Sequence, residues 1–116
     1  MANTITTNTV TRGSKQFQGA FKEMWTVKAT ISDTDAIALT DTLELAMTVP
    51  GVALGDMCIG GSLTLDLNDG TDSATGTYLV TAADTVSLYL LADKGEFAAD
   101  AINGAVVKVL VGRPNW

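Results

Sequence analysis

An acidic segment at positions 66–72 is the part of this sequence whose residue types come nearest to a ligand-binding motif, since it reads Asp-Leu-Asn-Asp-Gly-Thr-Asp. An EF-hand calcium loop takes oxygen ligands at loop positions 1, 3 and 5, glycine at 6 and a carboxylate at 12. Counted from Asp66, loop positions 5, 6 and 12 hold Gly70, Thr71 and Thr77, so the spacing does not match. We therefore interpret the segment as a hairpin loop whose Asp, Asn and Gly residues serve turn geometry, with a weak surface calcium contact left open.

Neighbouring carboxylates and a single thiol are the other candidates for catalysis. Asp33 lies close to Asp35 in the sequence, and Asp41 lies close to Glu44. Glycoside hydrolysis needs two carboxyl groups that face each other across a substrate, which closeness in sequence does not provide. Cys58 has no histidine to activate it, because the chain contains none. We therefore expect solvated carboxylates, a structural thiol, no enzymatic activity, no cofactor and no metal site.

The composition of the chain bounds its class. With 116 residues and 47% hydrophobic residues, it is long enough for one domain with its own core and too apolar for a disordered chain. No apolar run approaches the roughly 18 residues that cross a bilayer, and the first residues lack a hydrophobic signal region. We therefore expect no membrane partner and, with one cysteine, folding in a reducing cytoplasm.

Charge is distributed unevenly along the chain, whose net charge is −6. Residues 1–28 hold four basic residues and one acidic residue, whereas residues 29–116 hold three basic and twelve acidic residues. A chain this acidic lacks the basic face that duplex binding requires, so no nucleic-acid partner is expected. Two interpretations of the basic first segment stay open: an arbitrary placement of solubilising charge, or a segment that docks on an acidic neighbour.

Alternation of apolar and polar residues with a period of two predicts an all-β fold. The expected strands cover residues 24–31, 42–49, 57–59, 63–67, 78–82, 85–90 and 105–111. A helix over residues 34–48 is the weaker alternative, since its threonines favour extended structure. Ala83-Asp84 is expected to form a tight turn, and Trp25 is expected in the core. Six or seven short strands without a long helix predict a single small β-sandwich, jelly-roll-like, or a small barrel.

Residues 1–16 offer little for a core to bury, since Ile5 and Val10 are the only large aliphatic residues there. We interpret residues 1–16 as an extended N-terminal arm and residues 17–116 as the sandwich domain. The residues of this arm predicted to contact a neighbouring protein are Thr4, Ile5, Thr7, Val10, Arg12 and Lys15. The alternative, that residues 1–16 fold back on their own domain as an edge strand, stays open.

The C-terminal segment supplies four further candidate contact residues. Val106 and Leu110 lie on the second face of the last expected strand, and symmetric self-association would cover their apolar surface. Arg113 and Trp116 follow that strand. Tryptophan is enriched at interface hot spots, so Trp116 either anchors in a neighbouring subunit or packs on its own domain beside Pro114.

Three segments carry a resemblance to a known group of proteins. Residues 47–56 read MTVPGVALGD, residues 80–88 read VTAADTVSL, and residues 107–111 form a valine-rich strand. In order and spacing they resemble the small β-sandwich proteins of tailed-bacteriophage particles, which are head decoration (cement) or virion structural proteins. The likeness covers residues 42–111, and the loop at residues 69–76 is longer and more acidic than the pattern of that group.

The resemblance implies a protein of the outer capsid surface, on the virion, that folds in the host cytoplasm. Its implied partner is the major capsid protein, and its implied role is to stabilise the head by bridging capsid subunits. It also favours a trimer, otherwise a dimer, for the expected homo-oligomer. Two other functions stay open: a glycan- or host-binding module of a head or tail fibre, which needs an exposed aromatic platform, and a histidine-free hydrolase.

Overall fold

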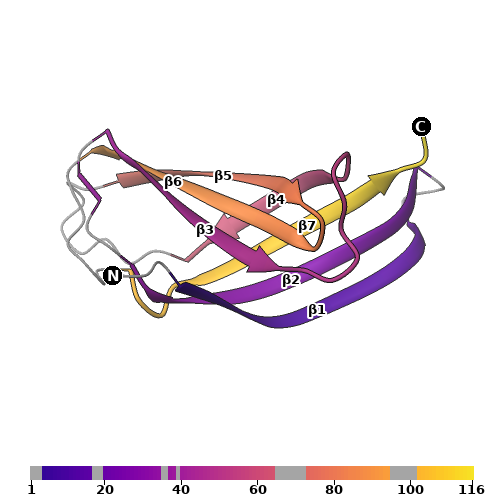
Figure 1. Ribbon diagram of the computed structural model, residues 1–116, viewed down its shortest axis with the longest axis horizontal. Coiled ribbons are helices and arrows are strands. Elements are labelled where there is room, and N and C mark those ends of the chain that lie inside the picture. The colour runs from indigo at the N-terminus through magenta and orange to yellow at the C-terminus, as the bar shows by residue number, and fades with distance from the viewer. Residues whose placement is uncertain (1–3, 17–19, 35–36, 39, 65–72, 95–101) are drawn as a thin grey trace.

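Seven strands and no helix make up the described part of the chain in the computed structural model, which covers residues 4–16, 20–34, 37–38, 40–64, 73–94 and 102–116. The strands are β1 (Thr4–Gln16), β2 (Phe21–Asp33), β3 (Thr42–Thr48), β4 (Met57–Leu63), β5 (Ser73–Ala82), β6 (Thr85–Lys94) and β7 (Val106–Pro114). They form an elongated body of 44 × 24 × 20 Å (Figure 1). The expected strand over residues 42–49 is confirmed and the helical alternative there is wrong, because Thr42–Thr48 alternate between exposed and buried side chains.

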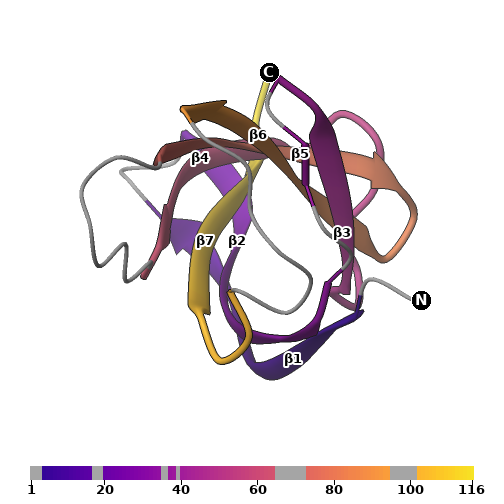
Figure 2. The ribbon, with the colours of Figure 1, turned by 90° about the vertical axis from the view of Figure 1, so that its left-hand side faces the viewer.

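Two antiparallel sheets face each other in this body (Figure 2). The four-stranded sheet has the order β1-β2-β7-β4, and the three-stranded sheet has the order β3-β6-β5. The predicted fold class, a small all-β sandwich, is thereby confirmed. Each sheet turns one face of alternating side chains to the other sheet and one face outward, as expected for sandwiches.

The core lies between the sheets and consists of the inward-facing side chains. From the four-stranded sheet it takes Trp25, Val27, Ala29, Ile31, Val107, Val109 and Val111, and from the three-stranded sheet Leu43, Leu45, Met47, Val86, Leu88 and Leu90. Trp25 is fully buried, which confirms its expected place in the core. β2 and β7 therefore hold the centre of one layer, with β6 at the centre of the other.

The prediction that residues 1–16 form an extended arm has to be corrected. Residues 4–16 form β1, which pairs antiparallel with β2 along nearly its whole length. This is the edge-strand alternative, so the proposed boundary between an arm and a domain at residue 17 is wrong. Ile5 and Val10 are half-buried and pack against the core.

A β-bulge explains why the sequence of β1 hides its strand pattern. The register between β1 and β2 shifts between Thr7 and Thr9, which leaves Asn8 as the extra residue. An extra residue reverses the alternation, so Ile5 faces inward before the bulge and Val10 faces inward after it. The hydroxyl of Thr30 donates a hydrogen bond to Asn8 Oδ1, 2.6 Å away, and holds the bulge on β2.

The tip of the β5–β6 hairpin fixes the turn that follows β3. The expected tight turn at Ala83-Asp84 is present, and Asp84 adopts a φ of 58°. The carboxylate of Asp84 accepts a hydrogen bond from Gly51 N at 2.8 Å, while its backbone pairs with Val49 and Val52. The Pro50-Gly51 turn is therefore held by a partner more than thirty residues away.

Alanine at Gly51 is expected to cost more stability than alanine at Gly55. Both glycines have a left-handed φ, of 95° and 99°, so both substitutions carry about 1–2 kcal/mol of backbone strain. A Cβ at Gly51 would in addition lie 2.5 Å from the guanidinium of Arg12, whereas a Cβ at Gly55 meets nothing within 4 Å. Urea unfolding should show Gly51→Ala as less stable than Gly55→Ala by about 0.5–1 kcal/mol, the usual size of the Arg12 contacts that must move. Equal losses would contradict the close approach.

Candidate interaction surface

The outward face of the four-stranded sheet carries a groove of about 500 Å³ that crosses all four of its strands. Its lining residues are Thr9 from β1, Thr26, Val27 and Lys28 from β2, Lys108, Val109 and Leu110 from β7, and Gly60, Gly61 and Ser62 from β4. Hydroxyl groups and two lysines surround an apolar floor. None of these lining residues is acidic, although the whole chain has a net charge of −6.

Two lysines lie side by side in the middle of this groove. Lys28 on β2 and Lys108 on β7 are direct partners in the antiparallel register, and both side chains are exposed. Like charges that face each other across two strands destabilise a sheet by a few tenths of a kcal/mol to about 1 kcal/mol. Within the described residues no carboxylate lies within 4 Å of either ammonium group, since all ion pairs found there involve Arg12 or Arg113. The positive charge of this face is therefore uncompensated by the described part of the chain.

Two glycines of β4 lie beside the groove, and they have different roles. A Cβ built at Gly60 would point into open space, with nothing within 4 Å. A Cβ at Gly61 would instead meet the ring of Tyr78 at 2.5 Å, on the side of β4 that faces β5. Gly61 therefore lets Tyr78 pack under β4, while Gly60 leaves the outer side of the groove unfilled.

The predicted contact residues of β1 are divided between two places. Thr4 is exposed, and Ile5, Thr7 and Val10 line a second groove of about 480 Å³ that reaches Thr48 and Pro50 beside β3. Within the described residues Thr7 Oγ1 is buried without a hydrogen-bond partner. The backbone of Lys15 belongs to β1, and its side chain lies outside the described part of the structure.

Val106 and Leu110 lie on the outward face of β7, as their alternation predicts, and both are half-buried. They flank Lys108, and Leu110 forms part of the groove floor. The sequence therefore identified one residue of the groove, Leu110, but not the lysine pair beside it. Nothing in the sequence alone sets Lys28 opposite Lys108, because the register joins strands that are far apart in the chain.

Arg12 and Arg113, predicted as contacts with a neighbour, have partners within their own domain. Their guanidinium groups lie over the ring of Trp25, each with its central carbon 5.1 Å from a ring centroid. Arg12 forms an ion pair with Glu23, and Nη1 of Arg113 lies 3.6 Å from the same carboxylate. Two cations on one indole are stabilised by its negative faces and by the shared acid.

Arg113 also ties the loop after β3 to the four-stranded sheet. It donates two hydrogen bonds to the carboxylate of Asp56, at 2.9 and 3.0 Å, and one to the carbonyl of Gly51 at 2.8 Å. The hydrogen bond with Asp56 raises the pKa of Arg113 above its ordinary value, so the guanidinium stays charged. The indole Nε1 of Trp25 donates to Pro50 O in the same loop. This cluster ties the two arginines to their own domain, while the side chain of Arg12 stays 46% exposed and that of Arg113 30% exposed.

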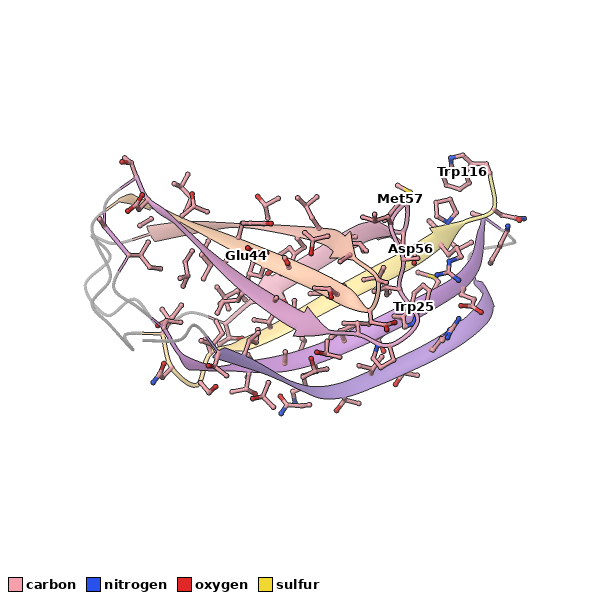
Figure 3. The ribbon with its side chains drawn as sticks, viewed as in Figure 1. Trp25, Glu44, Asp56, Met57 and Trp116 are labelled. Atoms are coloured by element: carbon pink, nitrogen blue, oxygen red, sulfur yellow. The ribbon has the colours of Figure 1, made fainter. Side chains whose placement is uncertain are left out.

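Trp116 lies at the same end of the molecule as Met57 (Figure 3). Its side chain is 80% exposed and its ring lies 5.8 Å from that of Phe21. Met57 and Ile59 on β4 are also exposed, by 43% and 42%. Trp116 thus keeps one contact with its own domain and presents most of its surface to solvent.

The candidates for catalysis give no catalytic arrangement within the described residues. Glu44 accepts hydrogen bonds from Ser87 and Tyr89 on the outward face of the three-stranded sheet. Asp35 and the acidic segment 66–72 lie outside the described residues, as does the side chain of Asp33. The described part of the chain contains no group of three potential metal ligands and no helix that could cross a membrane.

Cys58 is half-buried on β4 and packs against the core, and burial raises the pKa of its thiol to about 11. We expect the thiol to react with iodoacetamide at pH 8 about 100-fold more slowly in the folded protein than in urea, because the thiolate fraction differs by about that factor. The folded state should also lose stability as the pH rises from about 9 to 11, because the unfolded chain releases the thiol proton in this range and the folded chain holds it. Cys58→Ala should lose less stability over that pH range. Equal thiol reactivity in the folded and unfolded chain would contradict the burial.

The geometry defines a small antiparallel β-sandwich whose four-stranded sheet has a groove and two lysines on its outward face. No protein-family model, curated protein or solved structure matches this chain in comparisons of its sequence and fold.

Proposed function

We propose that this protein is a decoration (cement) protein of a tailed-phage head, which binds the outer capsid surface and stabilises the head by bridging capsid subunits. The observation that carries the proposal is the uneven character of its surface: one face has two lysines without a carboxylate partner among the described residues, on a chain of net charge −6. Such a face gives a soluble acidic protein one preferred orientation toward an acidic neighbour. The three sequence segments that resemble phage head proteins support the same function.

The proposed mechanism is repeated weak binding. A chain of this size offers only small contact areas, so a single copy would hold capsid subunits weakly. Self-association, as a trimer or otherwise a dimer, would join several such contacts and raise their combined strength by effective concentration. The exposed apolar side chains Met57, Ile59 and Trp116 at one end of the sandwich are the proposed contact between copies.

Co-sedimentation with capsids that lack this protein tests the proposal. The purified chain is expected to sediment with expanded capsids in a saturable manner, at a fixed molar ratio to the major capsid protein, and to raise the temperature at which the capsids disrupt. Sedimentation that does not saturate, or an unchanged disruption temperature, would contradict a cement function.

Light scattering of the free chain measures its oligomeric state, and Trp116→Ala is expected to shift that state toward the monomer.

A glycan- or host-binding module is the second candidate, and the exposed ring of Trp116 favours it. Exposed aromatic rings can stack on sugars, and the ring of Trp116 is 80% exposed with the ring of Phe21 5.8 Å away. A glycan array probed with the chain and with Trp116→Ala separates the two candidates. Binding of a sugar that disappears in the variant, without capsid binding, would favour the second function.

A further inference from the structure

We propose that the groove on the four-stranded sheet binds an extended acidic segment of a partner protein, with one carboxylate of that segment between Lys28 and Lys108. That the segment belongs to the capsid rests on the proposed function. The binding chemistry rests on the groove itself.

The charge in the groove selects a carboxylate. The two ammonium groups come from directly opposed positions on β2 and β7, and neither has a carboxylate partner within the described residues. One carboxylate between them would convert a like-charge repulsion into two attractive contacts. A nucleic acid would bring several phosphates to only two lysines, against the repulsion of a chain of net charge −6. An acidic protein segment therefore fits better than a phosphate backbone.

The shape of the groove selects an extended chain. The lining runs from Thr9 on β1 to Ser62 on β4, three strand spacings away, or about 14 Å. Four extended residues span about 13 Å, so a short segment laid across the strands would fill the groove and place its middle over the lysines. The hydroxyls of Thr9, Thr26 and Ser62 can bond to the amide groups of such a segment. Leu110 supplies apolar floor on the same face.

Gly60 provides a way to fill the groove without disturbing the fold. A Cβ at this position meets no atom within 4 Å, and the residue has no left-handed backbone conformation. Gly60→Trp should therefore fold normally and occupy the space that the acidic segment needs. Gly61 is unsuitable for this purpose, since a side chain there would collide with Tyr78.

The test uses the full chain, labelled with ¹⁵N, and a six-residue peptide that alternates glutamate with valine. Amide chemical shifts of residues in the groove are expected to move on titration, and a matched peptide with glutamine in place of glutamate should bind at least about fivefold more weakly. Lys108→Glu should weaken binding about fivefold to tenfold, because it removes one exposed ion pair and puts a like-charge repulsion in its place. Lys22→Glu, which changes the net charge equally on an exposed residue outside the groove, should change binding by less than about twofold. Gly60→Trp should abolish the shifts.

Several results would overturn the assignment. The assignment is contradicted if the glutamine peptide binds equally well, or if the chemical shifts move outside the groove. It is also contradicted if Lys22→Glu and Lys108→Glu have equal effects, or if an eight-nucleotide oligothymidylate binds more tightly than the peptide. Capsid co-sedimentation separates this inference from the proposed function. If the peptide binds in the groove but the chain does not bind capsids, the capsid is rejected as the partner and the groove remains a binding site for acidic segments. If Lys108→Glu and Gly60→Trp leave capsid binding unchanged, the groove is rejected as the capsid-binding site and the decoration function is retained.

Discussion

Replacing Trp25 with alanine is expected to lower the free energy of unfolding by about 3–5 kcal/mol, the usual cost of truncating a buried aromatic residue. Trp25 is fully buried, and its indole donates a hydrogen bond to Pro50 O. The guanidinium groups of Arg12 and Arg113 also make cation–π contacts with its ring. The substitution therefore opens a cavity and releases the loop after β3 together. Urea unfolding followed by circular dichroism measures the loss.

Trp116→Ala is the matched control for that substitution. The same side chain is removed, but from a position that is 80% exposed, so the expected loss is below about 1 kcal/mol. Equal losses for the two tryptophans would contradict the proposed role of Trp25 as the link between the core and the arginine cluster.

Deleting residues 2–14 is expected to unfold the chain or make it insoluble. Residues 4–16 form β1, whose inward side chains Ile5 and Val10 pack against the core and whose backbone pairs with β2. Without β1, the long strand β2 would become an unprotected edge, which is a template for aggregation. Circular dichroism and a ¹⁵N–¹H correlation spectrum would measure the loss of the folded state.

The point substitution Thr11→Ala serves as the control for this deletion. Thr11 is exposed on β1, so its replacement should leave folding within about 0.5 kcal/mol of the original. A soluble and folded truncated chain would show that residues 2–14 are dispensable to the sandwich and act only as a contact segment.

The sequence predicts the central strands because their alternation is unbroken. Thr42–Thr48 and Thr85–Leu90 show strict alternation, and the Ala83-Asp84 turn has clear turn chemistry. β1 is missed as a strand because the bulge at Asn8 breaks its alternation in the middle. With Asn8 counted as one extra residue, Ile5 and Val10 fall on the same face of the strand.

The candidate site is harder to predict because it depends on pairing between distant strands. The sequence places Leu110 on an outward face, but only the β2–β7 register sets Lys28 beside Lys108. The bonds that Arg12 and Arg113 make within the domain are hard to predict for the same reason. Their charge suggests a free surface, whereas Glu23 and Asp56, brought close by the fold, bind them within the domain.

The proposed decoration function is tested most directly by the number of copies of this protein on purified particles of a tailed phage that carries its gene. Quantitative mass spectrometry of intact virions, calibrated against the major capsid protein, measures that number. Protease or antibody access to the intact particle locates the copies. The account predicts many copies at a fixed ratio to the capsid protein, all accessible from outside, and fewer copies on particles that carry Lys108→Glu. Absence from washed particles, or a few copies confined to the tail, would contradict it.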